Sequence, residues 1–208
     1  DRVAAEIRAA GGTVRVYAGN AADGAFVDSV ASGALRERGA IDSVVTAAAV
    51  SLGKPLGETT ESHWDQTFAV NARGTFLGAQ AAVRTMTARG QGGVIVNVAS
   101  LAGLNGISPG LAAYVGSKHA VVGLTRQLAL ECAPQRIRVL AVAPSFMVTE
   151  GNMAMMQQDP RIAEAAAGHI PSMFSSKLGR VGVPDDIARA VLFCASDLEV
   201  YFDADYLI

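Results

Sequence analysis

The sequence predicts an α/β fold in which one doubly wound, parallel sheet carries helices on both faces. Segments with helical periodicity alternate with short apolar runs along the whole chain. The inner runs GVIVNV (93–98) and IRVLAVA (137–143) are apolar throughout, as expected for strands that are buried on both faces. With 208 residues, 50% of them hydrophobic, the chain has enough apolar surface for a single domain over 1–208.

Periodicity and turn residues place the elements in order. Helices are predicted at about 1–10, 23–38, 62–89, 111–132 and 184–196, with further helices within 144–180. Strands are predicted at 13–18, 41–48, 93–98, 137–143 and 205–208. Gly11 and Gly12 end the first helix, and the glycines at 90, 92 and 93 mark a turn before a strand rather than a phosphate cradle.

Composition and charge favour a small-molecule partner. The chain has 17 basic and 19 acidic residues and a net charge of −2, without a run of like charge, so we expect neither nucleic acid nor a membrane as partner. It also has no signal-peptide pattern and no apolar stretch of roughly 18 residues, so we expect a cytoplasmic protein. Cys132 and Cys194 are far apart in sequence and lack metal-ligand spacing, which predicts buried thiols and no metal site.

Three residues carry the predicted chemistry: Ser100, Tyr114 and Lys118. Tyr114 and Lys118 are four residues apart on a predicted helix, so their side chains share one face. An ammonium ~4 Å from a phenol favours the phenolate by about 4 kcal/mol at an effective dielectric near 20, which lowers the phenol pKa by about 3. A hydroxyl such as that of Ser100 can hold a substrate oxygen as charge develops on it. A Tyr-x-x-x-Lys pair also occurs often as an ordinary surface pair, but here the rest of the chain agrees with a catalytic interpretation.

Several blocks, taken in order, resemble the short-chain dehydrogenase/reductase family, in particular its 3-oxoacyl-carrier-protein reductase-like members. The resemblance covers nearly all 208 residues and implies a Rossmann-like domain. The matching blocks are VAAEIRAAGG, the segment Asn20-Ala-Ala-Asp23, FAVNARGTF with Asn71, Ser100, Tyr114-Val-Gly-Ser-Lys118, APSFMVT and GRVGVPDDIARAVLFCASD.

The resemblance implies hydride transfer between a nicotinamide, of NAD or NADP, and a carbonyl or alcohol carbon. Tyr114 would then be the general acid/base and Ser100 the anchor of the substrate oxygen, while Lys118 would lower the phenol pKa and bind the ribose. Asn71 would hold a water that links Lys118 to solvent, or would only bond a neighbouring backbone group. The implied cofactor-binding residues are Asn20, Ala48, Ala49, Tyr114, Lys118, Met147 and Thr149, although Met147 could equally serve packing. A homo-oligomer, either tetramer or dimer, is also implied.

The chain departs from the family pattern at several places. Thr46-Ala-Ala-Ala49 replaces Asn-Asn-Ala-Gly, and Ser145 replaces a glycine. No glycine-rich phosphate-binding turn follows a strand, so the resemblance begins only at the family's second helix. Without the family's first two strands, the strand at 13–18 would lie about three strand spacings, roughly 14 Å, from the strand at 41–48. Either the sequence is an N-terminally incomplete part of a longer protein, or the strands pair differently in a non-catalytic protein that does not bind dinucleotide.

Two further patterns were weighed. Gly106-Ile-Ser-Pro-Gly110 spells a nucleophile elbow, but Pro109 follows the serine and has no N–H for an oxyanion hole, so we reject a serine hydrolase. The Met- and Phe-rich segment 146–178 is expected to form either a lid over an apolar substrate or a helix-packing seam.

Overall fold

The computed structural model describes residues 2–147, 149–150, 180, 182–196 and 206–207. Its four strands are parallel and lie in the order β1-β2-β3-β4. They are β1 (Ser43–Thr46), β2 (Gly93–Val98), β3 (Ile137–Val142) and β4 (Tyr206–Leu207). This sheet confirms the predicted α/β class.

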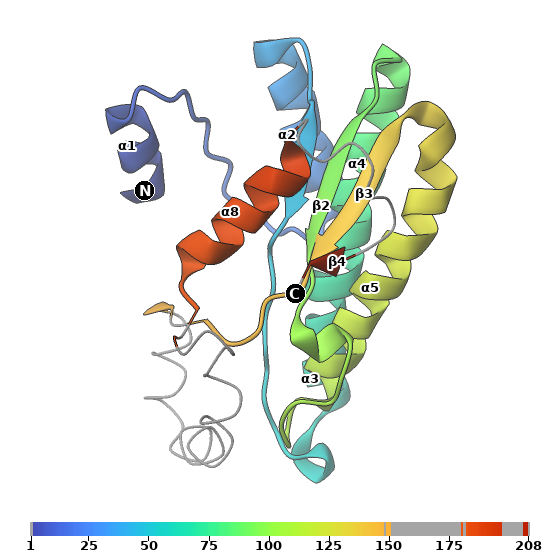
Figure 1. Cartoon of the computed structure of the whole chain (residues 1–208). Coiled ribbons are helices and arrows are strands. Elements are labelled where there is room, and N and C mark those ends of the chain that lie inside the picture. The colour runs from blue at the N-terminus through green and yellow to red at the C-terminus, as the bar shows by residue number, and fades with distance from the viewer. Residues whose placement is uncertain (1, 148, 151–179, 181, 197–205, 208) are drawn as a thin grey trace.

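Helices cover both faces of the sheet (Figure 1). Helices α4 and α5 pack on one face, against β1, β2 and β3, while α8 lies across β2 and β3 on the other. Helix α2 packs on α4. The helices are α1 (Arg2–Ala9), α2 (Gly24–Arg38), α3 (Glu61–Phe68), α4 (Gly74–Arg89), α5 (Ala112–Cys132) and α8 (Pro184–Ala195). Three-residue 3₁₀ turns lie at η1 (Leu56–Glu58), η3 (Leu101–Gly103) and η4 (Ala133–Gln135).

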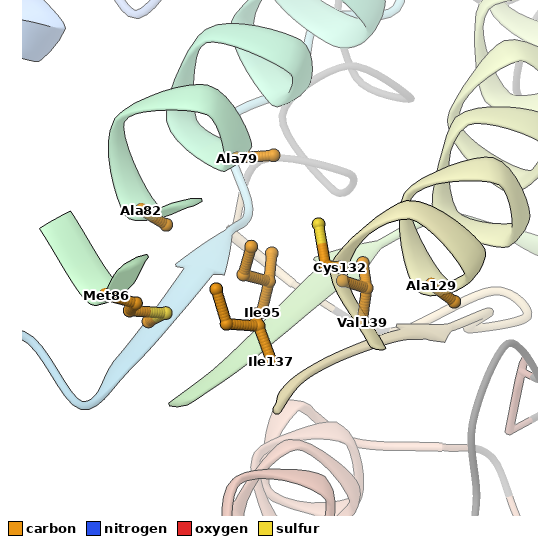
Figure 2. Close-up of a cluster of buried hydrophobic side chains, with 8 residues drawn as sticks. All are labelled: Ala79, Ala82, Met86, Ile95, Ala129, Cys132, Ile137 and Val139. Carbon is orange, nitrogen blue, oxygen red and sulfur yellow. The ribbon is translucent and has the colours of Figure 1, made fainter. Parts of the chain in front are cut away.

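The largest buried cluster fills the space between α4, α5 and the sheet. Figure 2 shows that small side chains on the helices meet branched side chains on β2 and β3. The members are Ala79, Ala82, Met86, Ile95, Ala129, Cys132, Ile137 and Val139. Alanine on the helix faces lets both helices lie close to the sheet. Cys132 and Cys194 are both buried, as predicted.

The strands differ in how far they are buried. In β2 and β3 nearly every residue is buried, which confirms the prediction made from their continuous apolar runs. In β1 burial alternates, and Val45 is 44% exposed. Strand β1 pairs only with β2 among the described strands, and α4 covers one of its faces, while α8 contacts β2 and β3. Strand β1 is therefore less buried than the two inner strands β2 and β3.

The strand predicted at 13–18 does not form. This segment makes no ladder, and Val16 is 47% exposed. Its side chains turn to α2 instead: Arg15 pairs with Glu37 at 3.2 Å, and the Tyr17 hydroxyl lies against Gly33. A strand needs a neighbouring backbone to exchange hydrogen bonds with, and no described strand lies beside this segment. Its backbone is therefore solvated rather than paired.

The helix predicted at 62–89 is interrupted. It consists of α3, a π-helical segment η2 (Ala69–Arg73) and α4. Apolar periodicity cannot reveal such an insertion, because a single wide turn changes the spacing at one point only. The insertion contains Asn71, which is 1% exposed. Single-turn π segments are often found at functional sites.

Most of the predicted helical region 144–180, including its methionine-rich part, lies outside the described residues. Residues 144–147 are not helical, and Met147 forms an isolated parallel bridge with Gly182. Within the described ranges, no helix is both long and apolar enough to cross a membrane.

Candidate active site

The predicted site residues gather where the parallel strands end. Ala47 to Ala49 directly follow β1, Ser100 comes two residues after β2, and Met147 follows β3. Carboxyl ends of parallel strands share one edge of the sheet, and in open α/β sheets ligands bind at that edge. The topology therefore brings together residues that are up to 100 positions apart in sequence.

Ser100 and Tyr114 lie close to one another. Ser100 is the N-cap of η3, and its Oγ accepts a hydrogen bond from the Ala102 N–H at 3.1 Å. The Tyr114 phenol, in the first turn of α5, lies near enough to the Ser100 hydroxyl for that hydroxyl to lower the phenol pKa. The two oxygens at which a substrate oxygen could bind are thus already adjacent.

Lys118 lies one helical turn after Tyr114 and on the same side of α5. Its Nζ is 5.8 Å from the centroid of the Tyr114 ring, which agrees with the side-by-side arrangement expected from the i,i+4 spacing. The side chain is only 3% exposed, and Nζ donates to the Val98 carbonyl oxygen at 2.8 Å. The cation is therefore held under the tyrosine by the end of β2.

Burial dominates the electrostatics of both groups. It raises the pKa of Tyr114 above its ordinary value, and the nearby Ser100 hydroxyl opposes this rise. Burial also lowers the pKa of Lys118 to about 8. The lowered phenol pKa expected from the sequence is thus not found in the chain alone, because an anion in this buried place loses its hydration. The ammonium lies near the phenol, but burial decides the direction in which the phenol pKa moves.

Asn71 joins the loop after β1 to helix α5. Its Oδ1 accepts from the Val50 N–H at 2.8 Å, and its Nδ2 donates to the Val50 carbonyl at 2.9 Å and to Ser117 Oγ at 2.9 Å. Both amide hydrogens are therefore in use, as the backbone-bonding alternative anticipated. A water at Asn71 would have to donate to an oxygen: the side-chain Oδ1, which accepts one N–H and has a second lone pair, or the backbone carbonyl, which already accepts from Thr75 Oγ1 at 2.7 Å.

Ser117 is a residue that sequence reasoning did not single out. Its Oγ accepts from Asn71 and donates to the Tyr114 carbonyl oxygen at 2.7 Å, and the residue is fully buried. The available signal was a small polar residue between the tyrosine and the lysine, among apolar neighbours in the first turns of the helix.

The other predicted cofactor-binding residues differ in burial and in local contacts. Asn20 is exposed, and its side chain accepts from the Ala22 N–H at 2.9 Å, which fixes the turn before α2. Ala48 and Ala49 are exposed, while Met147 and Thr149 are partly buried after β3. No described residues form a group of three or more potential metal ligands.

The donor chemistry fits a dinucleotide. Lys118 Nζ carries three hydrogens and donates one of them to Val98, which leaves capacity for a pair of ribose hydroxyls. Alanine side chains at 47–49 leave the backbone after β1 accessible, because a methyl group covers little of it.

Several named proteins are similar in sequence to most of this chain. The chain is 37% identical to D-threitol dehydrogenase of Mycolicibacterium smegmatis, over 95% of this chain and 72% of that protein. It is 35% identical to the 3-oxoacyl-[acyl-carrier-protein] reductase FabG of Thermotoga maritima, over 97% and 77%. It is also 37% identical to the inactive 2-(S)-hydroxypropyl-CoM dehydrogenase 2 of Xanthobacter autotrophicus, over 94% and 82%.

Solved structures show the same fold. A short-chain type dehydrogenase/reductase from Mycobacterium marinum superimposes with a TM-score of 0.89 and 30% identity, over 99% of this chain and 78% of that one. ElxO, solved with NADP bound, gives a TM-score of 0.79 and 28% identity, over 92% and 74%. The family model described as enoyl-(acyl carrier protein) reductase matches residues 1–207. The fold, the sequence relatives and this match together place the chain in the short-chain dehydrogenase/reductase family of oxidoreductases.

Proposed function

We propose that the protein is an NAD(P)-dependent oxidoreductase that moves a hydride between a nicotinamide and a carbonyl or secondary alcohol carbon. The observation that carries this proposal is the proximity of the Tyr114 phenol to Ser100, above the buried ammonium of Lys118. Three polar groups from two elements meet at the edge of the sheet where ligands bind in this class of fold. A merely structural role would not require a hydroxyl, a phenol and an ammonium at one point.

In the direction of reduction, Tyr114 supplies the proton that the substrate oxygen needs. Ser100 Oγ binds that oxygen and holds it beside the phenol. NAD(P)H, held by the cofactor-binding residues, would supply the hydride. In the direction of oxidation the same phenol oxygen, once deprotonated, takes the proton of the alcohol.

Lys118 stabilises the phenolate that forms when Tyr114 releases its proton. At a buried site of low dielectric, a nearby ammonium interacts with an anion more strongly than it does in water. The hydrogens that Val98 does not use would hold the ribose hydroxyls, and the positively charged ring of an oxidised nicotinamide, when bound, would lower the phenol pKa. Both contributions oppose the rise in pKa that burial causes in the chain alone.

Asn71 and the cofactor residues complete the proposal. The Asn71 carbonyl would carry the water that links Lys118 to solvent, while the side chain fixes Val50. Asn20, Ala48, Ala49, Met147 and Thr149 would line the dinucleotide. The names of the relatives indicate different substrates. We therefore propose only a class of substrate, a small carbonyl or alcohol compound. We also propose a cytoplasmic homo-oligomer, either a tetramer or a dimer.

A second candidate is a family member that does not turn over substrate. Ala49 stands where the family has glycine, and one relative at 37% identity is named as inactive. Absence of dinucleotide binding, together with absence of hydride transfer between a nicotinamide and any carbonyl or alcohol, would support this candidate.

The test uses the full-length protein with NAD⁺, NADP⁺ and their reduced forms against a panel of ketones and secondary alcohols. Turnover is followed by the absorbance of the reduced nicotinamide. We expect Tyr114→Phe to lower kcat by at least about 10²-fold while dinucleotide affinity is retained, since only the proton relay is lost. Tyr17→Phe is the matched control, because Tyr17 packs on α2 and should leave kcat unchanged. Normal turnover by Tyr114→Phe would refute the mechanism.

A further inference from the structure

The turn that carries Ser100 packs against the helix that carries Tyr114 and Lys118 at a single glycine. A Cβ atom on Gly103 would lie 2.7 Å from the Lys118 carbonyl oxygen, 3.0 Å from the carbonyl carbon of the same residue and 3.0 Å from Val122 Cγ2. These distances are shorter than van der Waals contact between carbon and its neighbours. Turn η3 and helix α5 can therefore meet at this separation only when position 103 has no side chain.

The helix side of this contact cannot move aside. The Lys118 carbonyl lies in the interior of α5 (Ala112–Cys132), where each carbonyl accepts the N–H four residues later. The neighbouring side chains Val121 and Val122 are 0% and 4% exposed, so they too are packed on all sides. A side chain added at position 103 would displace the turn rather than the helix.

The turn, in contrast, is bound tightly to Ser100. The Gly103 N–H donates to the Ser100 carbonyl oxygen at 2.8 Å, and the Ala102 N–H donates to Ser100 Oγ at 3.1 Å. On the far side, the Leu101 N–H is held by the Pro144 carbonyl at 2.9 Å. A displacement at Gly103 consequently reaches Ser100 within one short turn.

From this geometry we infer that Gly103 is a positioning residue, which sets the distance between the Ser100 hydroxyl and the Tyr114 phenol by allowing η3 to contact the α5 backbone. This inference rests on the proposed function, since it assigns Gly103 a part in holding the same pair of groups. Gly103 touches no substrate in this role and acts only through Ser100.

The main test is Gly103→Ala in the full-length protein. The added methyl group is expected to move Ser100 by up to about one ångström. A displacement of this size should lower kcat by about 10- to 100-fold. Gly106→Ala is the matched control: Gly106 lies in the same loop, and a Cβ there would meet nothing within 4 Å. Its kcat should stay within about twofold of the unchanged protein.

A double-mutant cycle separates positioning from general damage. If Gly103 acts through the serine hydroxyl, Gly103→Ala should have little effect on kcat once Ser100→Ala has removed that hydroxyl. An unchanged kcat in Gly103→Ala, or the same loss with and without the Ser100 hydroxyl, would overturn the inference while leaving the proposed function intact. Should Gly103→Ala not fold, the cycle is repeated in a Val122→Ala background, which removes the side-chain part of the clash and keeps the backbone part.

A second measurement does not depend on turnover. The tyrosinate absorbance of the protein is titrated with pH, and the titration of Tyr114→Phe is subtracted. Because the Ser100 hydroxyl lowers the pKa of Tyr114, we expect Gly103→Ala and Ser100→Ala each to raise that pKa, and the double variant to raise it no further than Ser100→Ala alone. If no substrate is turned over at all, the proposed function fails, and this titration still decides whether Gly103 sets the distance between the two groups.

Discussion

The ammonium of Lys118 donates to the carbonyl oxygen of Val98, the last residue of β2, at 2.8 Å. This bond ties the cation to the strand that leads directly to Ser100. The same strand end thus fixes two of the three groups in the candidate site. Since the lysine is only 3% exposed, its charge is held there at a cost in stability.

We expect Lys118→Met to raise the unfolding free energy at pH 7 by about 2 kcal/mol while abolishing turnover. Burial lowers the pKa of Lys118 from 10.5 to about 8, so the unfolded chain binds this proton more tightly than the folded chain. The stability of the unchanged protein should therefore rise between pH 8 and 10.5, as the proton leaves. The stability gained in Lys118→Met is smaller than the free energy that burial of the charge costs, because the variant also loses the hydrogen bond to Val98.

Urea unfolding of both proteins at pH 7 and at pH 10 measures this effect. The advantage of Lys118→Met should shrink at pH 10. A Met variant that is less stable than the unchanged protein at pH 7 would show that burial of the charge is not costly here.

Asn71→Leu should destabilise the fold by about 2–4 kcal/mol. The leucine is similar in size but leaves the N–H and carbonyl of Val50 and the hydroxyl of Ser117 without their partner. Gln127→Ala is the control, because its exposed bond to Glu131 should contribute less than about 0.5 kcal/mol. Equal urea midpoints for the two variants would contradict a stabilising role of the Asn71 hydrogen bonds to Val50 and Ser117.

A buried chain of hydrogen bonds holds the end of β1 in place. Thr46 Oγ1 donates to Asn97 Oδ1 at 2.7 Å, and Asn97 Nδ2 donates to Thr125 Oγ1 at 2.9 Å. Thr46→Val keeps the shape of the side chain but leaves Oδ1 of the fully buried Asn97 unpaired. We expect a loss of about 1–2 kcal/mol.

Thr85→Val provides the matched comparison for Thr46→Val. The Thr85 hydroxyl only donates to the Ala81 and Ala82 carbonyls in its own helix, and those carbonyls keep their helical hydrogen bonds without it. Thermal or urea unfolding should show less than about 0.5 kcal/mol of change for Thr85→Val. A Thr46→Val variant as stable as Thr85→Val would mean that water satisfies Asn97 without the threonine.

The sequence by itself determined the α/β class, the parallel strands β2 and β3, and the side-by-side placement of Tyr114 and Lys118. These features follow from local periodicity and spacing, which a single strand or helix expresses by its own geometry. The placement of Ser100 beside them followed from the family resemblance, and the carboxyl edge of the sheet explains it.

Tertiary structure alone decided the rest. Residues 13–18 have the composition of a strand, but no neighbouring backbone among the described strands pairs with them. The π-helical turn at Asn71 exists because its amide reaches Val50, 21 residues away. The pKa of Tyr114 rises rather than falls because the phenol is buried, and no spacing along the chain reveals burial. In each case the outcome depends on what surrounds a residue in space, and a pattern along the chain cannot express that.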